Sequence, residues 1–349
     1  MIIYILLPVL ILVLTIVYQP DNSIYPKRKI GFLFFVGILL VIVPGLRHLD
    51  VGLDTKTYYE MFIRSGQIST IAFLEESRHE PLYLVLTSIV NMMTGNFVIL
   101  QLIVAITYIG GVLIMVYNYS EKVWYSCLLY FVFTFYYMSF NEMRQAMAIG
   151  IVCIAFRFIV EKKFWSFLFS VTIAGCFHFS AFIILPLYFA NRIRKINIVK
   201  IGIIGGLFFL TLMTKISLMT YMNSMISIEY SENDETGGFG LLALQGLTLT
   251  LGYVLRNKIA QTPAILCMYY FIAFSLIIFP VCQLDPALFR LGQYSWIVMI
   301  VFVPNMLLCI KKGLFRLMGF LLYAMAGIPL ALNMYSIHNQ IIPYKFFWQ

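Results

Sequence analysis

The chain has 349 residues, of which 62% are hydrophobic and only 11% are charged, and its mean hydropathy is +0.91. This composition excludes an ordinary soluble domain, because too few polar side chains remain to cover the surface of one. The formal net charge is +9. The basic residues stand in short turns between apolar runs, so we expect no nucleic-acid partner.

Apolar runs of nearly membrane-spanning length recur along the whole chain, and a bilayer-spanning helix needs about 20 such residues. The runs are 2–18, 30–46, 81–94, 97–117, 123–140, 144–160, 164–190, 197–213, 239–255, 264–283, 291–310 and 314–333. They predict an all-α polytopic integral membrane protein with about 11–12 hydrophobic helices in a single transmembrane domain, 1–349. The run 164–190 is long for one span, and Pro186 together with the polar His178 predicts a bend or break in it.

The distribution of charge predicts which turns face the cytoplasm. Basic turns such as 27–29, 161–163 and 311–312 are typical of cytoplasmic turns, whereas ten of the fifteen acidic residues lie in 47–80 and 214–240. We expect these two loops to face outward. Five apolar runs separate 27–29 from 161–163, although an even number of crossings is required. One run must therefore be partial, either the short 81–94 run or a re-entrant region at 123–145.

Polar residues inside apolar runs are costly unless they are paired, hydrated or used. Asn141, Glu142, Arg144 and Gln145 interrupt the long run from 123 to 160. At helical spacing Asn141, Arg144 and the small Ala148 share one stripe, which leaves room for a ligand beside the arginine. The structural alternative is an ion pair, either Glu142–Arg144 or another Glu–Arg pair, that seals helix ends.

Two further runs carry one such polar residue each. His178 stands in an apolar run and Arg290 beside one. A core histidine bonded to a carbonyl is the alternative for His178. An arginine that extends to the membrane interface is the alternative for Arg290.

The 47–80 loop contains a predicted short helix with Asp54 as its N-cap, which places Tyr58 one turn further on. An ordinary solvated loop with a capping aspartate is the alternative.

Six cysteines all lie in apolar runs without metal-ligand spacing, so we expect no metal and no cofactor. Arginines suit phosphate oxygens without a metal, and aromatic rings and carboxylates suit sugars. A sugar linked to a lipid pyrophosphate offers both kinds of group.

Six short motifs occur in a fixed order along nearly the whole chain. They are Arg47 with 51–55 and Tyr58, Glu80-Pro81, residues 144–148, residues 177–181 with Leu185-Pro186, Arg290 with Tyr294, and Pro343-Tyr344. In this order the motifs resemble the EpsG-like family of Wzy-type polymerases, which make bacterial O-antigen, capsule and exopolysaccharide. Leu53 departs from the small residue or threonine that is common in that family.

The resemblance implies a GT-C-like, metal-independent glycosyltransferase, inverting or retaining, that uses undecaprenyl-pyrophosphate-linked oligosaccharides as donor and acceptor. It implies action at the outer face of the bacterial inner membrane, facing the periplasm or exterior. A chain-length regulator and a flippase are the partners that the family implies.

The resemblance also suggests roles for individual residues. Arg144 and Arg290 are the leading pyrophosphate ligands, with Gln145 beside the first, and Arg47 is a third, unless it pairs with Glu80. The candidate bases are His178, which we prefer, and Glu142, Asp54 and Glu80. The residues expected along the glycan path are Tyr58, Tyr294 and Tyr344.

Three other functions remain open from the sequence. A flippase for the same lipid-linked oligosaccharides would share the basic cavity but usually shows two related halves, which we do not find. A ligase or acyltransferase would share the arginines and the histidine and differ in its acceptor. A purely structural membrane protein would leave the clustering of polar groups in the outward loops unexplained.

Overall fold

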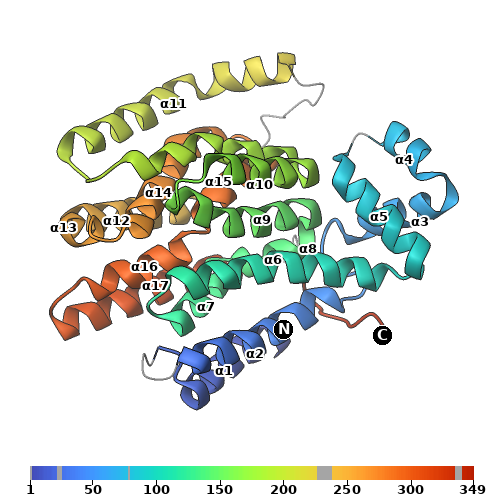
Figure 1. Ribbon diagram of the computed structural model, residues 1–349, viewed down its shortest axis with the longest axis horizontal. Coiled ribbons are helices and arrows are strands. Elements are labelled where there is room, and N and C mark those ends of the chain that lie inside the picture. Colours follow the sequence, from blue (N-terminus) through green and yellow to red (C-terminus); the bar gives the residue numbers. More distant parts are fainter. Residues whose placement is uncertain (1, 22–25, 78, 226–237, 335–339) are drawn as a thin grey trace. The chain divides into compact units, whose positions relative to one another are not determined.

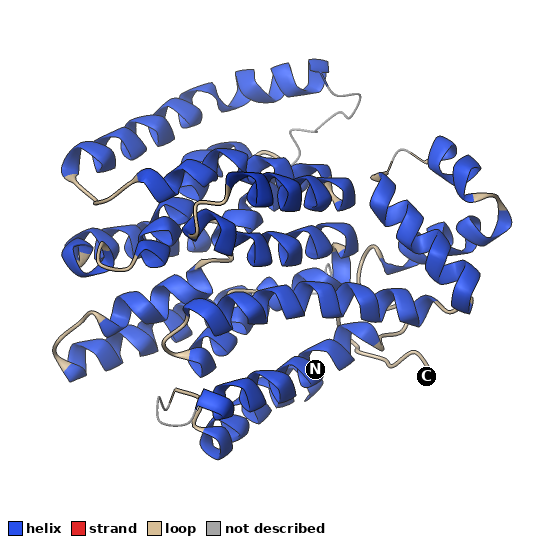
Figure 2. Ribbon diagram, viewed as in Figure 1, coloured by secondary structure: helices blue, strands red, loops and turns tan. Residues whose placement is uncertain are grey.

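The computed structural model describes residues 2–21, 26–77, 79–225, 238–334 and 340–349. Within these ranges the regular structure is helical, apart from an isolated bridge between Arg47 and Phe346 (Figure 2). In the part of the chain that the structure describes, seven helices are long and apolar enough to cross a membrane, and a bent pair can form an eighth span. The predicted fold class, a polytopic all-α membrane protein, is confirmed.

The chain forms two compact units. The first contains Met1–Phe158, Phe164–Phe182 and Gly327–Gln349, and the second contains Ile159–Lys163 and Ile183–Ala326. The prediction of a single transmembrane domain stays a prediction.

Most helices of the first unit match the apolar runs of the sequence (Figure 1). They are α1 (Ile2–Tyr18), α2 (Pro26–Gly45), α3 (Thr55–Gln67), α4 (Thr70–Glu76), α5 (Pro81–Thr94), α6 (Phe97–Tyr119), α7 (Val123–Val132), the 3-10 helix η1 (Phe135–Tyr137), α8 (Met138–Asn141), α9 (Met143–Val160) and α10 (Phe164–Phe177). The 3-10 helix η2 (Phe179–Arg192) begins in the first unit and continues into the second.

Two apolar runs are broken, and the sequence predicts the break in one of them, 164–190. The run from Val123 to Asn141 bends by 66°, and Thr134, at the break, has a left-handed φ of 70°. The long run at 164–190 breaks at His178, between α10 and η2. The predicted stripe from Asn141 through Arg144 is wrong, because the helix stops at Glu142 (φ −116°, ψ 57°) and restarts as α9.

Within the first unit, one end holds the basic turns. Lys29 donates to the Ser120 carbonyl at 3.2 Å, and Lys122 pairs with Asp21 at 3.3 Å. Helix α2 starts at this end, and its 20 residues span about 30 Å. Arg47, just past the last turn of α2, therefore lies at the other end of the unit.

Helix α5 does not run between these two ends. Its first residue follows Glu80, which contacts Arg144 at the start of α9, and Gly95 at its end lines a pocket with Arg47. Both ends of α5 therefore lie at the end of the unit that holds Arg47, beside α3 and α4 (Figure 1). The four remaining apolar segments between 27–29 and 161–163 run from end to end. This arrangement satisfies the even number of crossings and favours 81–94 as the partial run.

Helices α6 and α9 pack backbone against backbone. A Cβ added at Gly111 would lie 2.1 Å from the Gly150 carbonyl oxygen, and one at Gly150 would lie 2.4 Å from the Thr107 carbonyl oxygen. Small residues allow such close packing where lipid provides no hydrophobic drive between helices. This contact sets the position of α9, which carries Arg144 in its first turn.

The second unit is built around α14. Its helices are α11 (Ile198–Met225), α12 (Phe239–Val254), α13 (Arg256–Ile259), α14 (Pro263–Cys282), α15 (Pro286–Trp296), α16 (Met299–Leu308) and most of α17 (Gly313–Met334). Helices α11, α12, α15 and α16 all contact α14. The predicted end of the α11 run at 213 is wrong, because residues 214–225 of the expected 214–240 loop are helical. Residues 226–237 of that loop lie outside the described residues.

Candidate functional site

The site is organised around Glu80, the residue immediately before α5. Pro81 occupies the first turn of that helix, where the missing backbone N–H has no partner to lose. A residue before proline is restricted to extended backbone, and Glu80 has φ −67° and ψ 136°. The Pro81 start therefore fixes the backbone from which the carboxylate projects.

The Glu80 carboxylate binds residues from two other helix ends. Its Oε2 forms an ion pair with Nη1 of Arg144, in the first turn of α9. Its Oε1 lies 2.7 Å from His178 Nδ1 and accepts from the Phe179 backbone N–H at 3.1 Å, at the break between α10 and η2. We call Glu80, Arg144 and His178 the carboxylate cluster.

The neighbours of Glu80 hold it in its ionised form. Burial by itself would raise the pKa of Glu80, but the hydrogen bond from His178 and the charge of Arg144 outweigh it and lower the pKa to about 2. An ionised carboxylate only accepts hydrogen bonds, so Nδ1 of His178 must be the donor. In the neutral imidazole, Nε2 is then the nitrogen that is free to accept a proton.

Arg144 has donor capacity beyond its pair with Glu80. The Tyr58 hydroxyl of α3 also interacts with it. Nε of Arg144 is buried and has no acceptor among the described residues. The three side chains of the cluster remain partly accessible, with exposed fractions of 15% for Glu80, 20% for Arg144 and 24% for His178. A ligand can therefore reach the cluster.

His79 lies next to the carboxylate cluster, and the charge of the cluster affects its pKa. Burial lowers the pKa of His79, and the positive charge of Arg144 acts in the same direction. The neutral form of His79 is therefore favoured beside this arginine.

Arg47 forms a separate structural contact rather than joining the cluster. Its side chain is 1% exposed and donates to the Pro44 carbonyl, to Thr55 Oγ1 and to the Phe140 carbonyl. The suggested pairing of Arg47 with Glu80 is wrong, because Glu80 is bound by Arg144 and His178. Burial lowers the pKa of Arg47 to about 10, so the guanidinium is still charged at neutral pH.

The turn after Arg47 is held tightly against α8. Gly52 has φ 98°, and a Cβ there would lie 2.3 Å from the Phe140 carbonyl oxygen, so this position requires glycine. The next N–H, of Leu53, donates to Asn141 Oδ1 at 3.0 Å. Helix α3 begins directly after Asp54 as predicted, although the Asp54 side chain makes no capping hydrogen bond.

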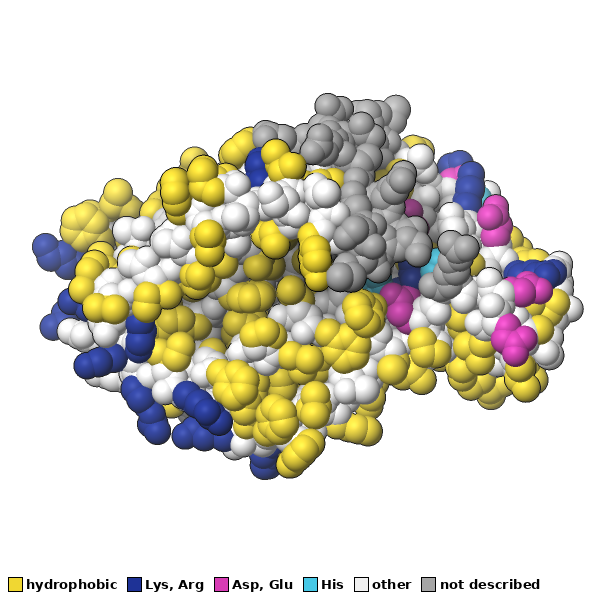
Figure 3. Space-filling model, turned by 90° about the horizontal axis from the view of Figure 1, so that it is seen from above, with side chains coloured by type: hydrophobic (Ala, Val, Ile, Leu, Met, Phe, Trp, Pro, Cys, Tyr) yellow, Lys and Arg dark blue, Asp and Glu magenta, His cyan; other side chains and the backbone are white. Residues whose placement is uncertain are grey.

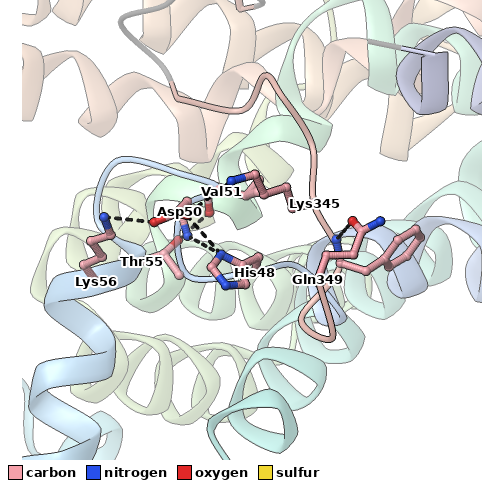
Figure 4. Close-up of polar contacts among 8 residues, drawn as sticks. His48, Asp50, Val51, Thr55, Lys56, Lys345 and Gln349 are labelled. Atoms are coloured by element: carbon pink, nitrogen blue, oxygen red, sulfur yellow. Dashed lines mark hydrogen bonds and ion pairs between the residues drawn. The ribbon is translucent and has the colours of Figure 1, made fainter.

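The C-terminal tail packs on the same turn. The His48 N–H donates to the Lys345 carbonyl at 2.9 Å, and Asp50 lies between Lys56 and His48, with Lys345 also in reach (Figure 4). The Tyr344 hydroxyl donates to the Val43 carbonyl at 2.8 Å. In this geometry the Tyr344 hydroxyl fastens the tail to the end of α2.

The structure thus brings four of the predicted site residues together: Glu80, Arg144, His178 and Tyr58. Glu142 lies at the break before α9, and Gln145 is buried in its first turn. Arg290 and Tyr294 lie on α15 of the second unit. Their membership of the same site stays a prediction, as do the roles of all these residues.

Sequence reasoning missed two residues at this end of the first unit, His79 and Gln101. His79 is adjacent to Glu80 in the sequence, and this position could have identified it as a site residue. Gln101 is a lone glutamine in an apolar helix, and only the pocket that it lines marks it as a candidate.

Figure 3 shows acidic side chains over α3, α4 and α5, with histidines beside them. Among the described residues, no group of three or more His, Cys, Asp or Glu side chains is placed to hold a metal ion.

The fold and the cluster define a polytopic membrane protein with an ionised carboxylate that orients an arginine and a histidine. A family model, described as the EpsG family, matches residues 30–346. The chain belongs to the EpsG family, whose members are Wzy-type polymerase-like. No curated protein and no solved structure matches the chain.

Proposed function

We propose that this protein is a polysaccharide polymerase that joins undecaprenyl-pyrophosphate-linked oligosaccharide repeat units at the outer face of the bacterial inner membrane, without a metal. Membership of the EpsG family supports a membrane protein of polysaccharide biosynthesis that acts as a glycosyltransferase-like polymerase. The observation that carries the finer proposal is the Glu80 carboxylate bound at once to Arg144 and His178.

His178 acts as the base in this proposal. Glu80 accepts from Nδ1 and so leaves Nε2 free to take the proton of the acceptor hydroxyl. The hydroxyl oxygen then forms a bond to the anomeric carbon of the donor sugar. The bond from that carbon to the pyrophosphate oxygen breaks, and its electron pair leaves with undecaprenyl pyrophosphate.

Arg144 stabilises the departing pyrophosphate. A guanidinium presents five N–H donors in a fixed fork that matches phosphate oxygens, and the Nε donor of Arg144 has no acceptor among the described residues. Donors fixed before the reaction stabilise developing charge most effectively, because they need no reorganisation. Arg290 is the second proposed pyrophosphate ligand.

The proposal is tested with purified protein in detergent. The protein is incubated with undecaprenyl-pyrophosphate-linked repeat units from the source strain in the presence of EDTA, and the products are separated as a ladder on a gel. We expect a ladder from the wild type and none from Arg144→Ala. Arg64→Ala is the matched control, because Arg64 pairs with Glu76 on the exposed surface of the same unit.

Three results would count against the proposal. A folded wild-type protein that makes no ladder from its native substrate would favour a flippase or a ligase, which assays of lipid flipping and of transfer to other acceptors would then distinguish. A ladder that disappears with EDTA would contradict the metal-independent mechanism. A ladder retained by Arg144→Ala would remove Arg144 from the site.

A further inference from the structure

A pocket of about 360 Å³ lies at the end of the first unit that holds Arg47. Its lining comes from the 47–49 turn, α3, the start of α6 and the C-terminal tail, and includes Arg47, His48, Tyr59, Asn96, Gln101 and Phe347. Specific ligand sites combine apolar and aromatic walls with a few placed polar groups. This pocket has that composition.

Gln101 is the residue that marks the pocket as a binding site. Its side chain is 1% exposed, and neither Nε2 nor Oε1 has a hydrogen-bond partner among the described residues. Buried amide groups are normally satisfied, so each exception requires an explanation. Since Gln101 lines the pocket, a ligand in the pocket would supply the missing partners.

The charges around the pocket favour a neutral ligand. The Arg47 guanidinium donates to three protein acceptors, and His48 lies 3.3 Å from the Asp50 carboxylate. The primary amide of Gln101 offers both a donor and an acceptor. A phosphate has only acceptors and would leave Oε1 without a donor, whereas neighbouring sugar hydroxyls both donate and accept.

Aromatic rings complete a surface that suits a sugar. Tyr59 and Phe97 pack edge to face with ring centroids 5.4 Å apart, and Phe347 lies at the pocket with 43% of its side chain exposed. Rings of this kind pack against the C–H faces of pyranoses, while the amide binds the hydroxyls at the ring edge.

Helix α3 connects the pocket with the carboxylate cluster. Tyr58 interacts with Arg144, and its neighbour Tyr59 lines the pocket. Consecutive residues of a helix point about 100° apart, so the two tyrosines serve different faces of α3. We propose that the pocket binds one sugar of the lipid-linked glycan away from the reacting bond, with Gln101 as its hydrogen-bonding residue; this inference rests on the proposed function.

The test measures binding of a glycan without its lipid. The probe is the oligosaccharide repeat unit released from the source strain's polysaccharide, added to purified protein in detergent and followed by titration calorimetry. We expect Gln101→Leu to bind it at least tenfold more weakly than the wild type and to yield shorter polymer. Tyr59→Ala, which removes a ring from the pocket wall, is expected to weaken binding as well.

Gln245→Leu is the matched control. Gln245 is also fully buried with both amide atoms unpartnered among the described residues, but it lies on α12 of the second unit. It is expected to bind the oligosaccharide as the wild type does. Gln101→Leu is expected to unfold at the wild-type temperature or above it, because the change removes an unsatisfied buried amide.

Three results would overturn the inference: no binding by the wild type, unchanged binding by Gln101→Leu, or an equal loss in Gln245→Leu. The proposed function is tested by a different measurement, the polymer ladder. Arg144→Ala is expected to lose the polymer ladder and to keep oligosaccharide binding. A retained ladder in that variant would remove Arg144 from the proposed mechanism, and no ladder from the folded wild type would refute the proposed function; neither result changes the binding measurement.

Discussion

Replacing Glu80 with glutamine keeps the shape of the side chain but removes the charge on which the carboxylate cluster depends. Lowering the pKa of this carboxyl from 4.5 to about 2 corresponds to about 3 kcal/mol in favour of the ionised form, at about 1.4 kcal/mol per pKa unit. Solvent screening at this partly exposed site reduces the contribution to about 2 kcal/mol. We therefore expect Glu80→Gln to destabilise the protein by about 2 kcal/mol at pH 7.

The same reasoning predicts how this stability depends on pH. Because the folded-state pKa is lowered, the contribution of Glu80 is fully present above pH 4.5 and is lost as the pH falls toward 2. The difference in Tm between the wild type and Glu80→Gln should therefore be largest at neutral pH. It should shrink progressively below pH 4.5.

Thermal unfolding of the purified protein in detergent measures both effects. At about 2 °C per kcal/mol for a chain of this size, the expected loss of Tm at pH 7 is about 4 °C. Glu76→Gln is the control, because Glu76 pairs with Arg64 in the open, where the two side chains are 51% and 48% exposed. Exposed pairs contribute about 0–1 kcal/mol. If Glu80→Gln proves as stable as Glu76→Gln at pH 7, the cluster does not hold the site together as described.

Three further substitutions test other parts of the structure. Arg144→Lys keeps the charge but loses the planar fork, so polymer yield in the ladder assay should fall by at least tenfold, and an unchanged ladder would exclude Arg144 as a phosphate ligand. Gly111→Ala should lower stability by about 1–3 kcal/mol in thermal unfolding, because the added Cβ meets the backbone of α9. Gly110→Ala, which enters open space, should be neutral or stabilising, and equal effects would refute the close contact of α6 and α9. Arg47→Met should cost about 3 kcal/mol or more in the same measurement, because it removes the Arg47 donor from buried acceptors at Pro44 and Thr55 and one of the two donors to the Phe140 carbonyl; a loss below 1 kcal/mol would contradict this role.

Much of the fold could be predicted from local sequence. The apolar runs gave the helices, because a bilayer-spanning segment must satisfy its own backbone hydrogen bonds within about 20 residues. The break at His178 was also predictable, because a polar residue and Pro186 interrupt a run too long for one span. The continuation of helix α11 through Met225 was not predictable from the apolar run.

The candidate site could be predicted only as a set of residues, not as an arrangement. Arg144 and His178 stand out in the sequence because charged and polar side chains inside apolar runs are rare. Their shared partner Glu80 lies 64 residues from the first and 98 from the second. The sequence offered four candidate bases and no means of ranking their contacts.

The sequence by itself determined which kinds of segment this protein contains: apolar helices, basic turns between them, and a few polar residues inside the helices. These properties follow from each segment's own need to satisfy its backbone hydrogen bonds internally and to present apolar side chains to lipid. Only the tertiary structure decided that Glu80 joins Arg144 to His178, that Arg47 fastens a turn instead, and that α5 starts and ends on one side. Such pairings depend on how helix ends meet in space, and residues far apart in the chain carry no local signal of the partner they will find.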